Sequence, residues 1–226
     1  MSRILSTPAD PLPATAPRQR RKEARPQELL DAALQLFGEK GFAATRTDDV
    51  AERAGVSKGT LYLYYPSKEE LLKAVISQRL SVEIAAVAAF ADQYEGPVAT
   101  LLTEVLPSWW QGVFDSPTSA IFKIVITEVR NFPELAEFYA REFAEPGKRL
   151  VGRILERGIA SGEFRAVDVP ATVLSLTLPM IMLCLHKHSL GACSPLPLEV
   201  DPKAFIQHHV DLVLRGLQAE PRRSKR

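Results

Sequence analysis

Cysteine, long apolar runs and an excess of charge of one sign are all scarce in this sequence of 226 residues. Its two cysteines, Cys184 and Cys193, are too few for a disulfide framework, which indicates a reducing cytoplasm and leaves one bridge as the alternative. Residues 1–17 contain no apolar core segment, so we expect no cleavable secretion signal. The longest apolar run, residues 173–185, contains Pro179 and is shorter than the ~20 residues that span a bilayer. We therefore expect no membrane partner.

Catalytic and metal-binding motifs are also missing. The sequence contains neither a Gly-x-Ser-x-Gly nor a His-Glu-x-x-His motif, and its carboxylates stand at helix starts or among lysines and arginines. Cys184, His186, His188 and Cys193 do not have the spacing of a zinc site, and two residues along a helix separate neighbouring side chains too far. We therefore predict no enzyme activity, no metal site and no cofactor.

No stretch alternates apolar and polar residues as a strand does, whereas helix start and stop signals recur to the end of the chain. Apolar residues recur at helical spacing from Pro26 onward. A second helix of about two turns is expected between Thr47, as its N-cap, and Gly55. A third begins at the cap Ser57 and is stopped by Pro66. Ser67 and Glu70 form a capping box that begins a fourth helix. The short turn between the second and third helices is typical of a helix-turn-helix, so the sequence predicts an all-α fold containing this motif.

Four parts of the chain differ in composition. Residues 1–17 are rich in Pro, Ala, Ser and Thr and are expected to be a disordered arm. Residues 18–76 are the expected helix-turn-helix domain, and residues 77–219 a helical regulatory, ligand-binding and dimerisation domain that shares the fourth helix with it. Residues 220–226 form a basic tail. The basic cluster within residues 18–25 has two interpretations, the solvated start of a helix or an arm that binds phosphates.

The third helix has a face that suits the major groove of DNA. On a helical wheel, Leu61 and Tyr65 share the inward face. The absence of a side chain at Gly59 lets the backbone approach a base pair, and Thr60 can reach a base edge or a thymine methyl. Flanking lysines and tyrosines can donate to phosphate oxygens. The predicted DNA-binding residues are Ser57, Lys58, Gly59, Thr60, Tyr62, Tyr64 and Lys68.

Two other interpretations of the same segment are weaker. Its tyrosines could instead line an ordinary core. The helix caps, the turn length and the tyrosine spacing would then agree with a helix-turn-helix only by accident. A phosphate loop for a nucleotide would place the glycine before the lysine, whereas here Lys58 precedes Gly59 and no strand comes before them.

Residues 25–76 resemble the N-terminal domain of TetR/AcrR-type transcriptional regulators. The resemblance rests on "GFAATRTDDVAERAGVSKGTLYLYYPSKEELL", residues 41–72. It implies a homodimeric repressor of a palindromic double-stranded operator, released when a small molecule bound to the C-terminal domain moves the fourth helix. It also implies that Thr47 contacts a phosphate. Leu63 departs from the polar or aromatic residue common at its position, and Tyr65 stands where phenylalanine is usual.

Large apolar side chains in the second half form either plain core or the wall of an effector cavity, because such cavities are mostly apolar. They favour an apolar or aromatic ligand. The expected cavity residues are Trp109, Trp110, Phe114, Phe122 and Met180.

Residues 168–190 form a helix that is apolar on nearly every side, so it needs a cover on two sides. One cover is its own domain, and the other is expected to be a second copy of the chain, with residues 151–159 completing a four-helix contact. The expected dimer residues are Ile154, Leu174, Leu178, Ile181 and Leu185.

The alternative to a DNA-binding regulator is a helical small-molecule binding or scaffold protein without specific DNA binding. Residues 18–83 keep it open, because they hold twelve lysines and arginines against ten acidic residues. The regulator hypothesis rests on the pattern of the third helix and on the family resemblance.

Overall fold

The computed structural model describes residues 17–193 and 199–218, and within them the chain is helical, with one isolated antiparallel bridge between Phe164 and Gln218. The expected basic tail lies outside the described residues, as does the expected arm up to residue 16. The elements are α1 (Pro17–Lys40), α2 (Thr47–Arg53), α3 (Lys58–Tyr64), α4 (Lys68–Ile76), η1 (Ser77–Ser81), α5 (Val82–Gln93), α6 (Val98–Thr100), η2 (Leu101–Val105), α7 (Leu106–Asp115), η3 (Pro117–Ser119), α8 (Ala120–Glu128), α9 (Pro133–Tyr139), η4 (Ala140–Ala144), α10 (Glu145–Ser161), α11 (Val169–His188), α12 (Leu190–Cys193) and α13 (Pro202–Leu217).

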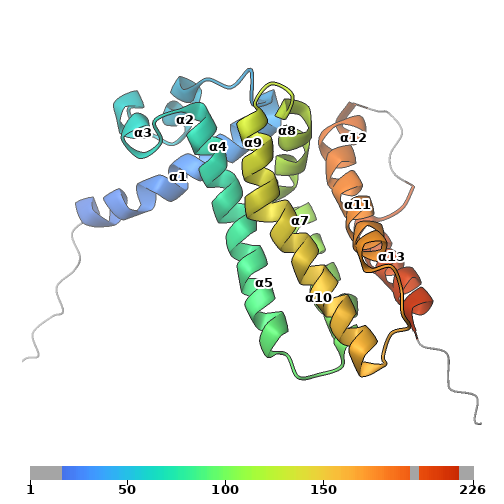
Figure 1. Ribbon diagram of the computed structural model, residues 1–226. Helices are drawn as coiled ribbons and strands as arrows, with labels where there is room; N and C mark the ends of the chain where they lie inside the picture. Colours follow the sequence, from blue (N-terminus) through green and yellow to red (C-terminus); the bar gives the residue numbers. More distant parts are fainter. Residues whose placement is uncertain (1–16, 194–198, 219–226) are drawn as a thin grey trace, which may run out of the picture.

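Several of these elements run on without a break. Helix α4 continues through the π-helical η1 into α5, forming one helix of 26 residues, Lys68–Gln93. In the same way, α6 leads through η2 into α7, and α9 leads through η4 into α10. Figure 1 shows α1–α3 at one end, α5 and α10 side by side in the body, and α11 with α13 on the far side from α1. The long helix α4–η1–α5 therefore joins the helix-turn-helix end to the body of the molecule.

Local signals in the helix-turn-helix segment are largely confirmed. The hydroxyl of Ser57 accepts a hydrogen bond from the Thr60 N–H (3.2 Å), and that of Ser67 accepts one from the Glu70 N–H (3.1 Å). Gly55 has a φ of 67°, which glycine adopts more readily than other residues and which ends α2 sharply. The expected end of α3 before Pro66 is also observed.

Two expectations about helix starts were wrong. Helix α1 begins at Pro17 and carries Pro26 inside it, because the arginines, lysine, glutamines and alanine around that proline are strong helix formers. Thr47 is the first residue of α2 and not its cap. The N-cap is Arg46, whose side chain makes no capping bond, and the Thr47 hydroxyl instead lies 2.9 Å from the Tyr62 hydroxyl.

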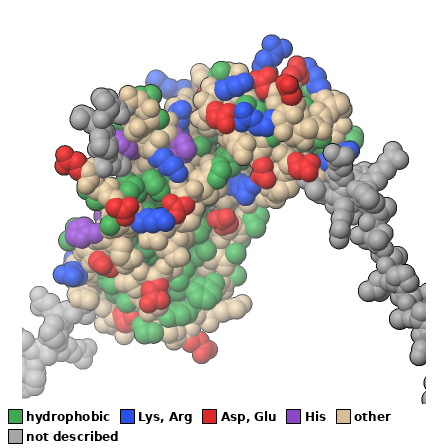
Figure 2. Space-filling model, turned by 180° about the vertical axis from the view of Figure 1, so that it is seen from behind, with side chains coloured by type: hydrophobic (Ala, Val, Ile, Leu, Met, Phe, Trp, Pro, Cys, Tyr) green, Lys and Arg blue, Asp and Glu red, His purple; other side chains and the backbone are tan. Residues whose placement is uncertain are grey.

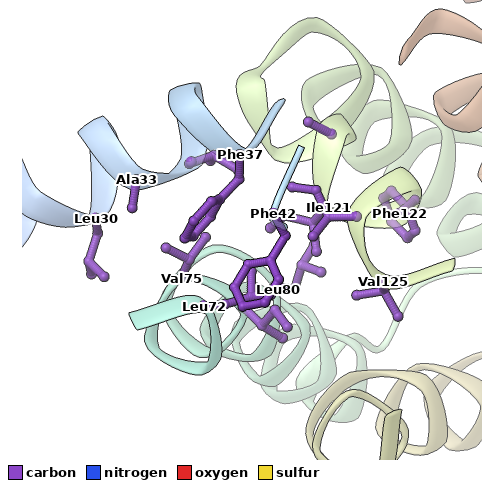
Figure 3. Packing of buried hydrophobic residues seen from close by; sticks show 14 of the residues in the cluster. Leu30, Ala33, Phe37, Phe42, Leu72, Val75, Leu80, Ile121, Phe122 and Val125 are labelled. Carbon is purple, nitrogen blue, oxygen red and sulfur yellow. The ribbon is translucent and has the colours of Figure 1, made fainter. Parts of the chain in front are cut away.

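One apolar core joins the helix-turn-helix end to the regulatory helices. Phe37 of α1, Leu72 of α4 and Ile121 of α8 are fully buried and belong to the same cluster, and Figure 3 shows side chains from these three helices turned toward one another. A second cluster, with Leu155 and Val210, fills the opposite end between α10, α11 and α13. The proposed boundary at residue 76 therefore falls inside a continuous helix that packs on both sides of it.

The expectation that no apolar stretch is long enough to span a membrane was wrong. Two helices, Lys68–Gln93 and Val169–Cys193, are long and apolar enough by length and composition, because each extends beyond its most apolar run. Core helices outside membranes pass the same test, and both helices contribute to the core clusters. Only 22% of the most apolar 18-residue stretch of the second helix is buried, so the other described residues leave much of α11 uncovered.

Candidate DNA-binding surface and ligand cavity

The surface of α3 is exposed where the sequence predicts DNA contacts. Leu61 is fully buried and fixes the inward face, whereas Ser57, Lys58 and Gly59 are exposed and Thr60 is half-buried. The expected outward position of Leu63 is confirmed, with 79% of its surface exposed. Figure 2 shows lysines, arginines and acidic residues interspersed around this end of the molecule, as the near-balance of charges predicts.

Side-chain pairs tie α2 to α3 across the turn. The hydroxyls of Thr47 and Tyr62 lie 2.9 Å apart, and the Lys58 ammonium lies 2.8 Å from an Asp48 carboxylate oxygen. The Asp48 carboxylate raises the pKa of Lys58, which therefore stays charged. Because this ion pair is exposed, it holds the ammonium only weakly. A phosphate oxygen can replace Asp48 as the partner of Lys58.

Lys68, an expected phosphate contact, has partners within the protein in this DNA-free structure. Its ammonium donates to the backbone carbonyls of Phe42 (2.8 Å), Ala43 (3.1 Å) and Thr45 (3.1 Å), and it lies 4.6 Å from the centre of the Phe42 ring. An ammonium has three donors, and all three are used by the loop between α1 and α2. Lys68 therefore anchors the start of α4 to that loop.

Replacing Lys68 by methionine is expected to lower the free energy of unfolding by about 1–3 kcal/mol, because charge-assisted bonds to three carbonyls are lost. Urea unfolding of the DNA-free protein measures the change. Lys58→Met is the matched control, since its ammonium pairs with an exposed carboxylate and otherwise lies 6.0 Å from the centre of the exposed Tyr62 ring. Equal stability of Lys68→Met and wild type would assign Lys68 back to the phosphate role.

An apolar cavity of ≈ 120 Å³ lies between the long helices of the body. Trp109 and Trp110, two of the expected cavity residues, line it. The indole Nε1 atoms of both are buried and have no hydrogen-bond partner among the described residues, which is unusual for buried tryptophan. Burial raises the pKa of Tyr139, another wall residue, so its hydroxyl stays neutral.

Three of the predicted cavity residues are elsewhere. Phe122 packs behind the wall, with its ring centre 5.7 Å from that of Trp110, and Met180 is buried in the first core cluster. Phe114 lies beneath the Lys187 ammonium, at 4.7 Å. Ring size alone indicated these residues, and it does not distinguish a wall from the core behind it.

The sequence prediction missed the wall contributed by α5, η2, η4 and α10, including Ile84, Leu102, Phe143 and Ile154. Two of these elements, η2 and η4, are π-helical turns, which occur often at functional sites. A π-helical turn depends on how a helix is packed, so no residue pattern in the sequence revealed it.

The expected dimer residues divide into two groups. Leu174 and Leu178 of α11 are 42% and 53% exposed, and Ile181 and Leu185 beside them are half-buried. Ile154 is different: it is 8% exposed, so its surface is already covered by its own domain. Leu174, Leu178 and Ile181 line the same cavity as Ile154.

Residues 151–159, the expected second part of the four-helix contact, expose charged side chains such as Arg153 and Glu156. Apolar exposure lies instead on α11, where Met182 is 59% exposed, and on α13, where Leu212 is 60% exposed.

The histidines and cysteines considered for a metal site lie apart. His188 Nε2 is 2.8 Å from the Ser119 hydroxyl, Cys184 is buried and Cys193 is exposed. Burial and the neighbouring Lys187 lower the pKa of His188 to about 4. Among residues 17–193 and 199–218, no three His, Cys, Asp or Glu side chains cluster as metal ligands do.

Comparison with known proteins gives two family matches along this chain. Residues 29–75 match the family "Bacterial regulatory proteins, tetR family", and residues 95–190 match "Tetracyclin repressor-like, C-terminal domain". The uncharacterized HTH-type transcriptional regulator YfiR of Bacillus subtilis is 30% identical over 161 residues, 70% of this chain and 77% of that protein. The HTH-type transcriptional repressor KstR2 of Rhodococcus jostii is 33% identical over 154 residues, 66% of this chain and 72% of that protein.

A solved structure shows the same fold over most of both chains. The transcriptional regulator FadR from Bacillus subtilis, in complex with stearoyl-CoA, has a TM-score of 0.64 and 19% identity, covering 85% of this chain and 99% of that one. The all-α architecture with an N-terminal helix-turn-helix is thus shared, and the members of this family are regulators rather than enzymes. The chain belongs to the TetR family of DNA-binding transcriptional regulators.

Proposed function

We propose that this regulator is a homodimeric repressor that leaves a palindromic operator when an apolar or aromatic ligand enters the cavity. The observation that carries the proposal is the cavity itself. Its wall is almost wholly apolar, and the N–H groups of two wall tryptophans have no acceptor among the residues that the structure describes. A ligand with a large apolar part and one hydrogen-bond acceptor, such as a carbonyl oxygen, would satisfy both features.

The helix α4–η1–α5 connects this cavity to the DNA-binding end. Ile84 of α5 lines the cavity, while Lys68 at the start of α4 holds the loop that leads into α2. Helix α9 also contacts α4, and η4 of the cavity wall contacts η1. A ligand that shifts these elements therefore changes the position of α2 and α3. A coupling free energy of roughly 1–3 kcal/mol, 5- to 150-fold in affinity, is the usual scale.

The volume of the cavity supports a ligand-dependent change of shape. At ≈ 120 Å³ it is smaller than the ~300–1,000 Å³ typical of drug-sized ligands. A ligand of that size can enter only if wall helices move apart. The ligand-bound regulator is then expected to differ from this structure at α5, η2 or η4.

The names of similar proteins agree with this proposal. KstR2 is named a transcriptional repressor, and the FadR structure is a complex with a long-chain acyl thioester of coenzyme A. The first name supports a repressor and the second complex a largely apolar effector, while the ligand of this chain is inferred from its own cavity.

The proposed DNA contacts separate into two kinds. Lys58→Ala is expected to weaken binding to all duplexes and to reduce the slope of log K against log[salt] by about 1, because one phosphate contact is lost. Thr60→Val removes the hydroxyl that lies 2.9 Å from that of Ser57. It is expected to change the difference in binding free energy between the preferred base and the others by about 1–3 kcal/mol. Competitive selection from random duplexes, repeated at two salt concentrations, measures both. A wild type without sequence preference would favour the helical scaffold protein.

The test of the effector proposal begins with an operator selected from random duplexes by the wild type. Apolar and aromatic compounds are screened by quenching of Trp109 and Trp110, and the binders are titrated against the protein–operator complex. We expect the compounds that quench tryptophan fluorescence to lower the affinity of the protein for operator DNA. By linkage, they should bind free protein more tightly than DNA-bound protein, by the same factor as the loss of operator affinity. A compound that quenches with equal affinity in both states would show occupancy without coupling and would refute the switch at this cavity.

A further inference from the structure

A second cavity of ≈ 450 Å³ lies in the groove between α10 and α11, directly beside the apolar cavity. Its floor is apolar, with Val169 and Val173 of α11, whereas its α10 side carries Lys148, Arg149 and Arg153. Lys148 and Leu174 line both cavities, so the two spaces meet at these side chains. A single ligand can therefore occupy both.

Positive charge dominates the lining of this groove. Three cationic side chains face one carboxylate, that of Glu156. The Lys148 ammonium pairs with Glu145 at 2.9 Å and the Arg153 guanidinium with Asp92 at 3.5 Å, but all four side chains are about half exposed, so these pairs are weak. Arg149 is exposed and makes no ion pair within 4.0 Å among the described residues. The groove therefore has cationic groups available for an anion.

We propose that this basic groove, lined by Lys148, Arg149 and Arg153, binds the polyanionic head of an amphiphilic effector whose apolar chain fills the adjoining cavity. The inference rests on the proposed function, since it assigns the polar half of the same effector. Two guanidinium groups and one ammonium match phosphate oxygens, because arginine donates to them in pairs and lysine adds a point charge. One carboxylate would use only part of this set, so a phosphate-bearing head fits it better.

The experiment compares three probes that share one chain and differ only in the head. Dodecanoyl-CoA carries phosphates, dodecanoate one carboxylate and dodecanol no charge. Dissociation constants are measured by tryptophan quenching, at low and high salt, on full-length protein. The test variant is Lys148→Gln/Arg149→Gln/Arg153→Gln. The control is Arg141→Gln/Lys203→Gln, which removes two exposed cations outside the groove.

In the wild type we expect dodecanoyl-CoA to bind more tightly than dodecanoate, and dodecanoate more tightly than dodecanol, with salt dependence decreasing in the same order. The test variant should bind dodecanoyl-CoA at least about tenfold more weakly, equivalent to about 1.4 kcal/mol. The affinity of the test variant for dodecanol should stay within about twofold of the wild type. The affinities of the control variant for dodecanoyl-CoA and for dodecanol should do the same.

Each other outcome has a definite meaning. If dodecanol binds and releases operator DNA but the test variant binds dodecanoyl-CoA as tightly as the wild type, the groove does not hold the head, and the cavity proposal survives. If the variant changes the association state without changing the affinity for dodecanoyl-CoA, the groove is covered by a second copy of the chain and the inference is wrong. If none of the three probes quenches fluorescence, both this inference and an acyl-type effector fail.

Discussion

Met182→Asp is expected to convert the proposed dimer into soluble monomers at micromolar concentration. Met182 and Leu178 lie one turn apart on α11 and are 59% and 53% exposed, in a stripe that none of the described residues covers. In the proposed dimer this stripe is buried, and each copy would bring one unpaired carboxylate into it. Such a charge costs more than the ~1–3 kcal/mol of an unpaired neutral polar group. Twofold symmetry applies that cost twice.

Sedimentation of wild type and variant at the same concentrations measures the effect. Because Met182 is exposed and does not line the cavity, the monomer should keep its helical circular dichroism spectrum, and ligand should still quench its tryptophan fluorescence. Leu63→Asp is the matched control, since Leu63 is also an exposed apolar residue but lies on α3, at the other end of the molecule. A wild type that sediments as a monomer would reject the dimer, and a dimeric Met182→Asp would place the interface elsewhere.

Phe42→Ala is expected to lower the free energy of unfolding by about 3–5 kcal/mol, the usual cost of removing a buried aromatic ring. The ring is fully buried and its centre lies 5.2 Å from that of Phe37 in α1 and 5.1 Å from that of Phe132, just before α9. It also receives the Lys68 ammonium on its face. Truncation opens a void where the helix-turn-helix end meets the regulatory helices, so operator affinity should fall as well.

Urea unfolding with a single fitted slope for all variants measures the loss. Leu63→Ala, a truncation at a position that is 79% exposed in the same part of the chain, should change stability by no more than about 0.5 kcal/mol. A loss below about 1 kcal/mol for Phe42→Ala would mean that the site collapses around the void and that Phe42 does not hold the two ends together.

Short-range features of this chain could be predicted from its residues. The caps at Ser57 and Ser67, the left-handed turn at Gly55 and the outward position of Leu63 depend on contacts within a few residues. Such contacts follow from backbone preferences that act locally. The all-α fold followed in the same way, from repeated helix starts and stops.

The role of Lys68 could not be predicted in this way. Its partners, the carbonyls of Phe42, Ala43 and Thr45, are 23 to 26 residues away along the chain. Only the packing of α4 against α1 places them within reach of one ammonium. The sequence identified a lysine at a helix start, which is equally suited to a phosphate and to a backbone loop.

The cavity also combines features that the sequence determined with features that only the tertiary structure decided. The sequence by itself determined that large apolar side chains crowd the second half and that α11 is apolar on more sides than one domain can cover. Tertiary structure decided that Trp109 and Trp110 are wall, that Phe122 and Met180 are core, and that Ile154 faces inward. The physical reason is that burial depends on the apolar area removed from water, which is the same for a wall and a core residue until neighbouring helices are in place.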